Sequence, residues 1–144
     1  MAEKRIELIT SMWELRSELE ILPPFNRFSD IVNEKIARAS TKRIIEKGVK
    51  IIRENEKGFQ FYIILKGSFA VTQKGKKIGK LGPGEIFGEY SVLSNKLRNA
   101  TIESMEKSVV FEMSNKDINH ILETSPGFQF IINQLLLERH EKIE

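Results

Sequence analysis

The residues best suited to chemistry in this chain are an acid, Glu89, and a base, Arg98, which lie nine positions apart in a glycine-rich run that begins at Gly84. Unpaired charge is costly to bury, so such a pair is usually kept for itself or for a ligand. Gly88 lets a backbone approach closely, and the segment after it is short enough for one helical turn, whose free amide groups face an anion. The planar guanidinium of Arg98 suits a phosphate. Two interpretations follow, an anion site and a structural ion pair, and the surrounding glycines favour the anion site.

The spacing of this run is also that of a known motif. Phe87-Gly88-Glu89, followed by Arg98-Asn99-Ala100-Thr101, resembles the phosphate-binding cassette of cyclic-nucleotide-binding domains. That family includes the regulatory subunits of protein kinase A, bacterial catabolite activator proteins and cyclic-nucleotide-gated channels. The resemblance implies that Glu89 accepts a hydrogen bond from the ribose 2′-hydroxyl and that Arg98 pairs with the cyclic phosphate. It also implies that backbone amides complete the cradle, those of Gly88, Ser91 and Asn99.

The base of the nucleotide is less well defined by the sequence. Val71 and Ile78 are similar in position to residues that line the base pocket in the family, although aliphatic strand residues are equally explained as core. Asn99 stands where kinase-type cAMP sites carry alanine and cGMP sites often carry threonine. The expected ligand is therefore cAMP or cGMP, with cAMP favoured on family frequency, and no further cofactor is expected.

Other chemistry finds little support in the sequence. The two histidines, His120 and His140, fall in predicted helices, whereas a metal-binding barrel needs several ligands pointing inward from its strands. Glu85 is the acid nearest to Glu89 and is more simply a turn residue, so no pair of acids is expected to act in catalysis. No nucleophile-elbow or phosphate-loop spacing occurs. We expect no metal, no catalytic residues and no enzyme activity.

Composition places the chain among ordinary globular proteins. Its 144 residues are 40% hydrophobic and 30% charged, and they contain no cysteine, which excludes disulfides and thiolate metal sites. No apolar run approaches the length of a membrane span, and the N-terminus is charged where a signal peptide is apolar. We expect a cytoplasmic protein without membrane contact.

The net charge of +3 is unevenly distributed. Residues 42–80 hold 11 Lys and Arg against 3 Glu, whereas the remaining residues hold 12 against 17. A solvated strand surface explains this layout better than a nucleic-acid or membrane patch, because aromatic residues do not interleave with the lysines. No helix-turn-helix is present, so direct DNA binding is not expected.

The residue pattern in the middle of the chain is typical of short strands joined by tight turns. Eight of the nine glycines lie between Gly48 and Gly88, and alternating runs such as Phe69–Gln73 lie between them. Asn55 stands where the family has a glycine, and asparagine also tolerates positive φ. The fold class is therefore α+β, a small, jelly-roll-like antiparallel β-barrel of about eight strands with flanking helices. The strands are expected near 42–45, 49–53, 60–65, 69–73, 76–81, 101–104 and 109–113.

Helices are predicted on both sides of this barrel. Apolar residues at helical spacing predict a helix over residues 1–22, so the chain divides into an N-terminal helix, 1–24, and a barrel domain, 25–144. The first helix either packs on its own domain or forms a homodimer, since Trp13 widens its apolar stripe. Ser29 and Ser114 are predicted N-caps, and Pro126 is expected at the first position of the last helix.

The sequence thus predicts a stand-alone cyclic-nucleotide sensor that signals through movement of its terminal helices to an unknown protein effector. On the family spacing, a residue that caps the base falls near Ile143, so the lid is expected to be weak or to come from elsewhere. The alternative is a structural or protein-interaction module that uses the same barrel without binding a nucleotide.

Overall fold

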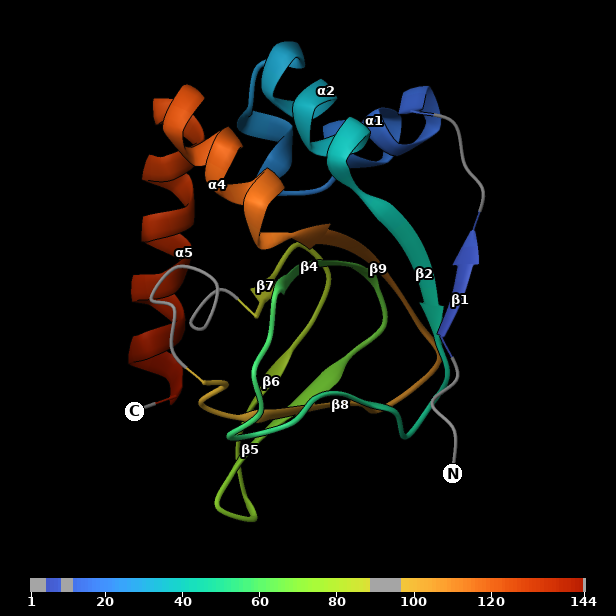
Figure 1. Ribbon diagram of the computed structural model, residues 1–144, viewed down its shortest axis with the longest axis vertical. Helices are drawn as coiled ribbons and strands as arrows, with labels where there is room; N and C mark the ends of the chain where they lie inside the picture. Colours follow the sequence, from blue (N-terminus) through green and yellow to red (C-terminus); the bar gives the residue numbers. More distant parts are fainter. Residues whose placement is uncertain (1–4, 9–11, 89–96, 144) are drawn as a thin grey trace.

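The chain folds into two antiparallel β-sheets, with most of its helices gathered at one end of the sheets (Figure 1). The computed structural model describes residues 5–8, 12–88 and 97–143. In chain order the elements are β1 (Arg5–Leu8), α1 (Met12–Glu20), the 3-10 helix η1 (Phe25–Arg27), α2 (Asp30–Ala39), β2 (Thr41–Ile45), β3 (Lys50–Ile52), β4 (Gln60–Lys66), β5 (Phe69–Gln73), β6 (Lys76–Leu81), β7 (Ile86–Phe87), β8 (Thr101–Ser104), β9 (Ser108–Ser114), α4 (Asn115–Thr124) and α5 (Pro126–Ile143).

The sheets have five and four strands within the described ranges. The strand orders are β1-β2-β9-β4-β7 and β3-β8-β5-β6, and every pairing is antiparallel. The predicted α+β, jelly-roll-like class is confirmed. The barrel itself is corrected to two sheets that face each other, because each sheet ends in edge strands and does not close on itself.

Strand β4 lies between two hydrophobic clusters and contributes residues to both. Phe61 and Ile63 point into one, and Tyr62 and Ile64 point into the other. We call the first the helix-side core; its buried members are Leu15, Leu19, Phe25, Ile36, Ala37, Phe61, Ile63, Ile86, Phe111, Met113, Ile118, Ile121, Phe128 and Ile132. We call the second the inter-sheet core; its buried members are Ile45, Val49, Ile51, Ile52, Tyr62, Ile64, Phe69, Val71, Leu81, Phe87, Ala100, Ile102 and Val110. The continuous apolar run of β4 follows from burial on both faces.

The N-terminal prediction is wrong at its start. Arg5–Leu8 is not helical but forms strand β1, which pairs with β2 so that Arg5 lies opposite Ile45 and Leu8 opposite Lys42. This pairing satisfies backbone groups of β1 through a partner far away in the sequence, which local helical spacing does not reveal.

Helix α1 packs on its own domain. Leu15 and Leu19 are buried in the helix-side core, whereas Trp13 is 62% exposed with the Arg16 guanidinium 5.2 Å from its ring. The structure thus bears out the interpretation in which this helix covers its own sheets. The homodimer stays a prediction, and Trp13 is exposed on the helix that was expected to form it.

Capping side chains fix where the helices begin. The Ser29 hydroxyl accepts a hydrogen bond from the Val32 amide at 3.3 Å, and the Ser114 hydroxyl accepts one from the Asp117 amide at 3.2 Å. Both satisfy amides that a helix start leaves unpaired, so both predicted N-caps are confirmed. Pro126 opens α5 as expected.

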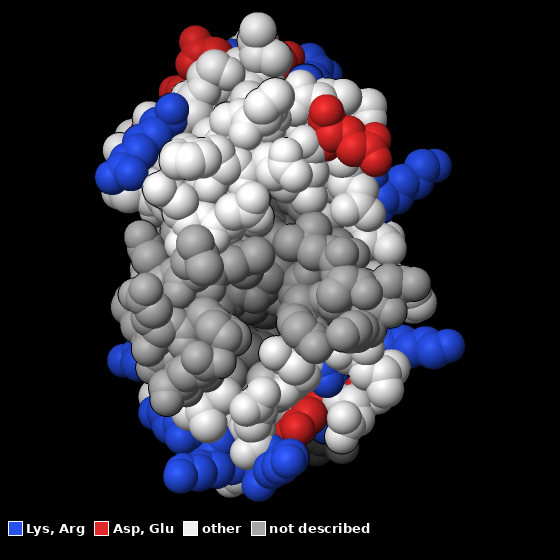
Figure 2. Space-filling model, turned by 90° about the vertical axis from the view of Figure 1, so that its left-hand side faces the viewer, with Lys and Arg blue, Asp and Glu red and all other residues white. Residues whose placement is uncertain are grey.

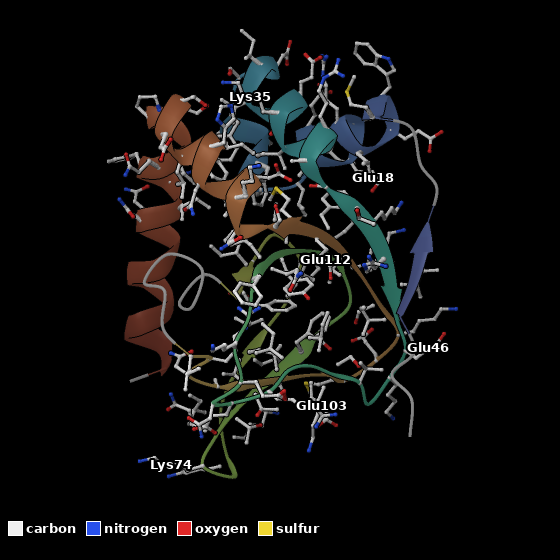
Figure 3. All side chains as sticks on the ribbon, viewed as in Figure 1. Glu18, Lys35, Glu46, Lys74, Glu103 and Glu112 are labelled. Carbon is white, nitrogen blue, oxygen red and sulfur yellow. The ribbon has the colours of Figure 1, made fainter. Side chains whose placement is uncertain are left out.

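The tip of the β5–β6 hairpin lies at the end of the molecule opposite the helices (Figure 3). Lys74 and Gly75 form this tip, and both have positive φ, 51° and 78°. Such a pair matches the right-handed twist of the flanking strands, which explains the tight two-residue turn. Asn55 also has positive φ, 69°, as expected for an asparagine in place of the family's glycine.

Candidate functional site

Gly88 directly follows strand β7 and has no room for a side chain. Its φ is +87°, and a Cβ atom added there would lie 2.7 Å from the Gln60 carbonyl oxygen and 3.0 Å from Arg98 Nη1. The close backbone approach expected at Gly88 is therefore present, and Gln60 of β4 makes it. Glycine is required both for the torsion angle and for the space.

Arg98 is held by its backbone to the turn that follows β3. The Asn55 amide donates to the Arg98 carbonyl at 2.8 Å, and the Arg98 amide donates to the Glu56 carbonyl at 2.9 Å. This reciprocal pair of hydrogen bonds fixes the start of the Arg98 side chain beside the turn. The orientation of the guanidinium is therefore decided by contacts farther along the side chain.

The Arg98 side chain lies inside the protein and is only 6% exposed. Its Nη1 donates to the Gly88 carbonyl at 2.8 Å, and its Nη2 donates to the Gln60 carbonyl at 2.9 Å. Burial lowers the pKa of the Arg98 guanidinium from its ordinary value, and the charge interaction with Tyr62 partly opposes this. Since arginine starts from a very high pKa, Arg98 stays protonated, and a negative charge placed beside it gains more than it would in water.

A cavity of about 260 Å³ opens next to Arg98. Basic side chains dominate its charged lining, with Glu56 as the acid among the described residues that border it. The surrounding field therefore attracts anions. The described lining comprises Lys50, Ile51, Ile52, Arg53, Glu56, Lys57, Gly58, Gln60, Tyr62 and Arg98.

The aromatic side chains next to the cavity fix the strand that carries Gly88. Tyr62 of β4 stacks on Phe87 of β7 with ring centroids 4.8 Å apart, and Phe69 of β5 packs against the same Phe87 at 5.1 Å. These contacts hold the short strand β7 against both sheets. The inter-sheet core therefore holds Gly88 in place beside Arg98.

The predicted base-pocket residues belong to the inter-sheet core or pack against it, and neither is among the described residues that border the cavity. Val71 is buried in the inter-sheet core, and Ile78 packs against that core while partly exposed. Their role toward a base stays a prediction.

Asn99 is exposed, and its carbonyl accepts a hydrogen bond from the Gln73 side-chain amide at 2.8 Å. That contact ties the chain after Arg98 to strand β5. A contact between Asn99 and a base or phosphate stays a prediction. Glu89 and Ser91 lie outside the described residues, so their predicted roles also stay predictions.

Glu85 has the turn role expected of it. Its Oε2 accepts a hydrogen bond from the Gly82 amide at 2.6 Å, inside the turn that precedes β7. Its carboxylate therefore stabilises the turn that leads into the site.

Two further statements hold for the part of the chain that the structure describes. No group of three or more His, Cys, Asp or Glu side chains is placed to hold a metal ion there. None of the helices in that part of the chain has the length and apolar character that crossing a membrane requires.

The family model of the cyclic nucleotide-binding domain matches residues 42–125, which is more than half of the chain. The match runs from β2 to the residue after α4 and contains Gly88 and Arg98. The chain belongs to the cyclic nucleotide-binding domain family. Within this domain, Gly88 and Arg98 belong to the motif on which the resemblance rests, and their role toward a ligand stays a prediction.

Curated relatives of this cyclic nucleotide-binding domain are parts of larger proteins. A cAMP-dependent protein kinase regulatory subunit of Debaryomyces hansenii is 36% identical over 89 residues, which covers 61% of this chain and 20% of the relative. A cyclic nucleotide-gated potassium channel of Mesorhizobium japonicum is 28% identical over 127 residues, which covers 88% of this chain and 34% of the channel. The chain thus spans about a fifth of the first of these relatives and about a third of the second.

The fold of the domain is shared with solved structures. The regulatory domain of Toxoplasma gondii PKA, solved in a co-crystal with cAMP, superposes with a TM-score of 0.77 at 20% identity. That superposition covers 88% of this chain and 50% of the other. At this identity the likeness establishes the architecture of two sheets with flanking helices.

Sequence reasoning missed three groups that shape the site. The carbonyls of Gln60 and Gly88 orient the guanidinium, and Gly58 lies directly beneath it. Backbone carbonyls leave no trace in side-chain patterns. In the sequence Gly58 resembles the other turn glycines. Its position three residues before the apolar run of β4 could have indicated that another group approaches the backbone closely there.

Proposed function

We propose that this domain binds a cyclic nucleotide monophosphate, with cAMP as the leading candidate, and that binding shifts its C-terminal helices. The buried, carbonyl-oriented guanidinium of Arg98 beside an open cavity is the observation that carries this proposal. We expect the cyclic phosphate of the nucleotide to bind to the Arg98 guanidinium.

Arg98 is prepared for an anion before one arrives. The Gln60 and Gly88 carbonyls fix the plane of the guanidinium, so little side-chain freedom remains to be lost on binding. Because the side chain is buried, its attraction for a phosphate is screened less than at a surface. A charge-assisted contact of this kind supports tight and specific binding.

The cavity supports a small anionic ligand. Its volume of about 260 Å³ lies near the lower end of ligand pockets, which suits a compact nucleotide. Lys50, Arg53 and Lys57 at its border add a field that draws anions toward Arg98. In the proposed complex the Glu89 carboxylate accepts the ribose 2′-hydroxyl, and amides of Gly88, Ser91 and Asn99 complete the phosphate cradle.

cAMP is the leading candidate ligand because two similar proteins are named for it. The Debaryomyces hansenii relative is a regulatory subunit of a cAMP-dependent kinase, and the Toxoplasma gondii structure contains cAMP. Asn99 is the residue expected to distinguish the two bases.

The proposed output is a change in the position of α5 relative to the sheets. Helix α4 continues from the end of β9, and α5 begins at Pro126 immediately after it. Lys35 of α2 donates to the side chains of Thr124 and Ser125 at this junction, at 3.3 and 3.4 Å. A ligand shifts the equilibrium between two positions of α5 only by the difference in its affinity for the two states. Because the contacts at this junction are weak, a small difference in affinity is enough for such a shift.

Calorimetric titration with cAMP, cGMP and 5′-AMP tests the proposal. The domain should bind a cyclic nucleotide at micromolar or lower concentration and bind 5′-AMP at least about tenfold more weakly, since a cavity shaped for a cyclic phosphate leaves polar groups unpaired around an open one. A 2′-deoxy analogue of the bound nucleotide should lose affinity if Glu89 accepts the ribose hydroxyl. The absence of heat with any nucleotide, in folded and ligand-free protein, would reject the function.

The alternative function is a protein-interaction module, and one observation favours it. Trp13, Ile21 and Ile31 are 62%, 81% and 67% exposed on the helical end of the molecule. Light scattering after size-exclusion chromatography, compared with Trp13→Ala, tests whether Trp13 contributes to self-association. Catalytic activity is not part of either proposal, and a cytoplasmic location and action without a linked output domain stay predictions.

A further inference from the structure

The turn between β3 and β4 passes directly beneath the Arg98 side chain at Gly58. A Cβ atom added to Gly58 would lie 1.8 Å from Arg98 Nε, 2.1 Å from Cζ and 2.3 Å from Nη2. Atoms that are not bonded do not approach so closely. The guanidinium therefore occupies the space that a side chain at position 58 would fill.

Gly58 is required for this space and not for its torsion angle. The glycines with positive φ are Gly48, Gly67, Gly75, Gly84 and Gly88, and Gly58 is not one of them in the described chain. The φ angle at position 58 therefore does not exclude alanine, and the three atoms nearest to the added Cβ all belong to the Arg98 side chain. This separates a steric effect on one side chain from a general effect on folding.

We propose that Gly58 is a positioning residue of the ligand site, which lets the Arg98 guanidinium lie across the turn and face the bound anion. This inference rests on the proposed function, because it assigns Gly58 a role in the same site. Three features of the turn form a template for Arg98. The backbones of Asn55 and Glu56 fix its start, the bare Cα of Gly58 accommodates its middle, and the Gln60 carbonyl binds its end.

A side chain at position 58 should displace the guanidinium while leaving the fold intact. Arg98 is anchored through its own backbone, so its flexible side chain can rotate away from a new methyl group without moving a strand. That rotation gives up the hydrogen bonds to the Gln60 and Gly88 carbonyls, which hold the guanidinium in one orientation. Binding should therefore suffer far more than stability.

The test compares Gly58→Ala with Gly82→Ala in calorimetric titrations with cAMP and in urea unfolding. Gly82 is a matched control, because it also lacks positive φ and a Cβ added there meets no atom within 4 Å. We expect Gly58→Ala to weaken binding by about 10- to 100-fold, the loss that follows when a charge-assisted hydrogen bond is broken. Gly82→Ala should stay within about twofold, and both variants should unfold close to the unchanged protein.

A double substitution asks whether Gly58 acts through Arg98. In an Arg98→Ala background, Gly58→Ala should cause no further loss of affinity, because the displaced group is already absent. Equal losses in both backgrounds would overturn the inference, and so would Gly58→Ala protein that binds cAMP as tightly as the unchanged domain.

The Arg98 Nε–H resonance separates this inference from the proposed function. Gly58→Ala should shift that resonance in a ¹⁵N-correlated spectrum of the ligand-free protein, while Gly82→Ala leaves it in place. An unchanged protein that binds no cyclic nucleotide would reject the proposed function, and with it the ligand role of Gly58. An Nε–H resonance unmoved by Gly58→Ala would reject the positioning role even if the domain binds cAMP.

Discussion

The two faces of strand β4 serve different parts of the molecule. Phe61 and Ile63 face the helix-side core, where α1, α2, α4 and α5 contribute Leu15, Ile36, Ile118 and Phe128 among others. Tyr62 and Ile64 face the inter-sheet core, which contains residues of both sheets and no helix residue among its buried members in the described chain. Residues that are neighbours in sequence therefore belong to different structural units.

The candidate site belongs to the inter-sheet side. Ile52 and Tyr62 border the cavity and are also members of the inter-sheet core, and Gly88 follows Phe87 of that core. Figure 2 shows a group of Lys and Arg side chains at the lower end of one face, with further Lys and Arg side chains along its sides and near its top. The cavity and the helix-side core therefore lie on opposite faces of β4, whereas α5 extends beyond that core and also contacts β6 of the other sheet.

The largest expected effect is on the helix side. Phe61→Ala removes a fully buried ring from the helix-side core, so the free energy of unfolding should fall by about 3–5 kcal/mol. Urea unfolding measures this loss. A decrease below about 1 kcal/mol would mean that the helices do not depend on β4 for their packing.

A matched pair on adjacent residues should separate stability from binding. Tyr62→Leu removes the stacking on Phe87 and should lower stability by about 1–3 kcal/mol, with a clear loss of cAMP affinity because Gly88 is less well held. Phe61→Leu should lower stability similarly and leave the affinity of the folded protein nearly unchanged. If both variants bind alike, the division between the two faces is wrong.

A smaller effect is expected at the junction of α4 and α5. Lys35→Met removes the hydrogen bonds to Thr124 and Ser125 and should lower the free energy of unfolding by about 0.5–1.5 kcal/mol. Hydrogen exchange should quicken at this junction and stay unchanged in β5 and β8. Lys116 is an exposed lysine on α4, and Lys116→Met provides the control. Equal exchange in the two variants would mean that the Lys35 hydrogen bonds do not stabilise this junction.

The smallest effect is expected at the mouth of the cavity. Lys57 is exposed and contributes only to the field around the site, so Lys57→Gln should slow nucleotide association at low salt and change affinity by less than about 1 kcal/mol. Stopped-flow measurements at two ionic strengths reveal this, with Lys116→Gln as control. A salt dependence that is the same in both variants would argue against electrostatic attraction by Lys57.

Local signals predicted most of the fold. Ser29, Ser114 and the Lys74-Gly75 turn act through neighbouring backbone groups, so the sequence alone locates them. Strand β1 was missed because its hydrogen bonds come from β2, and the division into two sheets was missed because closure depends on pairings between distant strands.

The candidate site was predictable in its side chains and not in its backbone. Gly88 and Arg98 stand at recognisable spacing, and the structure brings them together. The Gln60 carbonyl binds the Arg98 guanidinium, and the guanidinium fills the space that a side chain at Gly58 would need, but neither contact has a side-chain signature in the sequence. Three-dimensional contact is needed to see them.

Calorimetric titration of Arg98→Ala with cAMP tests most directly whether Arg98 binds the cyclic phosphate. The control is Arg38→Ala, since Arg38 is exposed on α2 and pairs with Glu34 at 2.8 Å, away from the cavity. Arg98→Ala should lose about 2–5 kcal/mol of binding free energy, because a buried phosphate would be left without its charged partner. Arg38→Ala should bind as the unchanged domain does. Folded Arg98→Ala protein with undiminished affinity for cAMP would contradict the account.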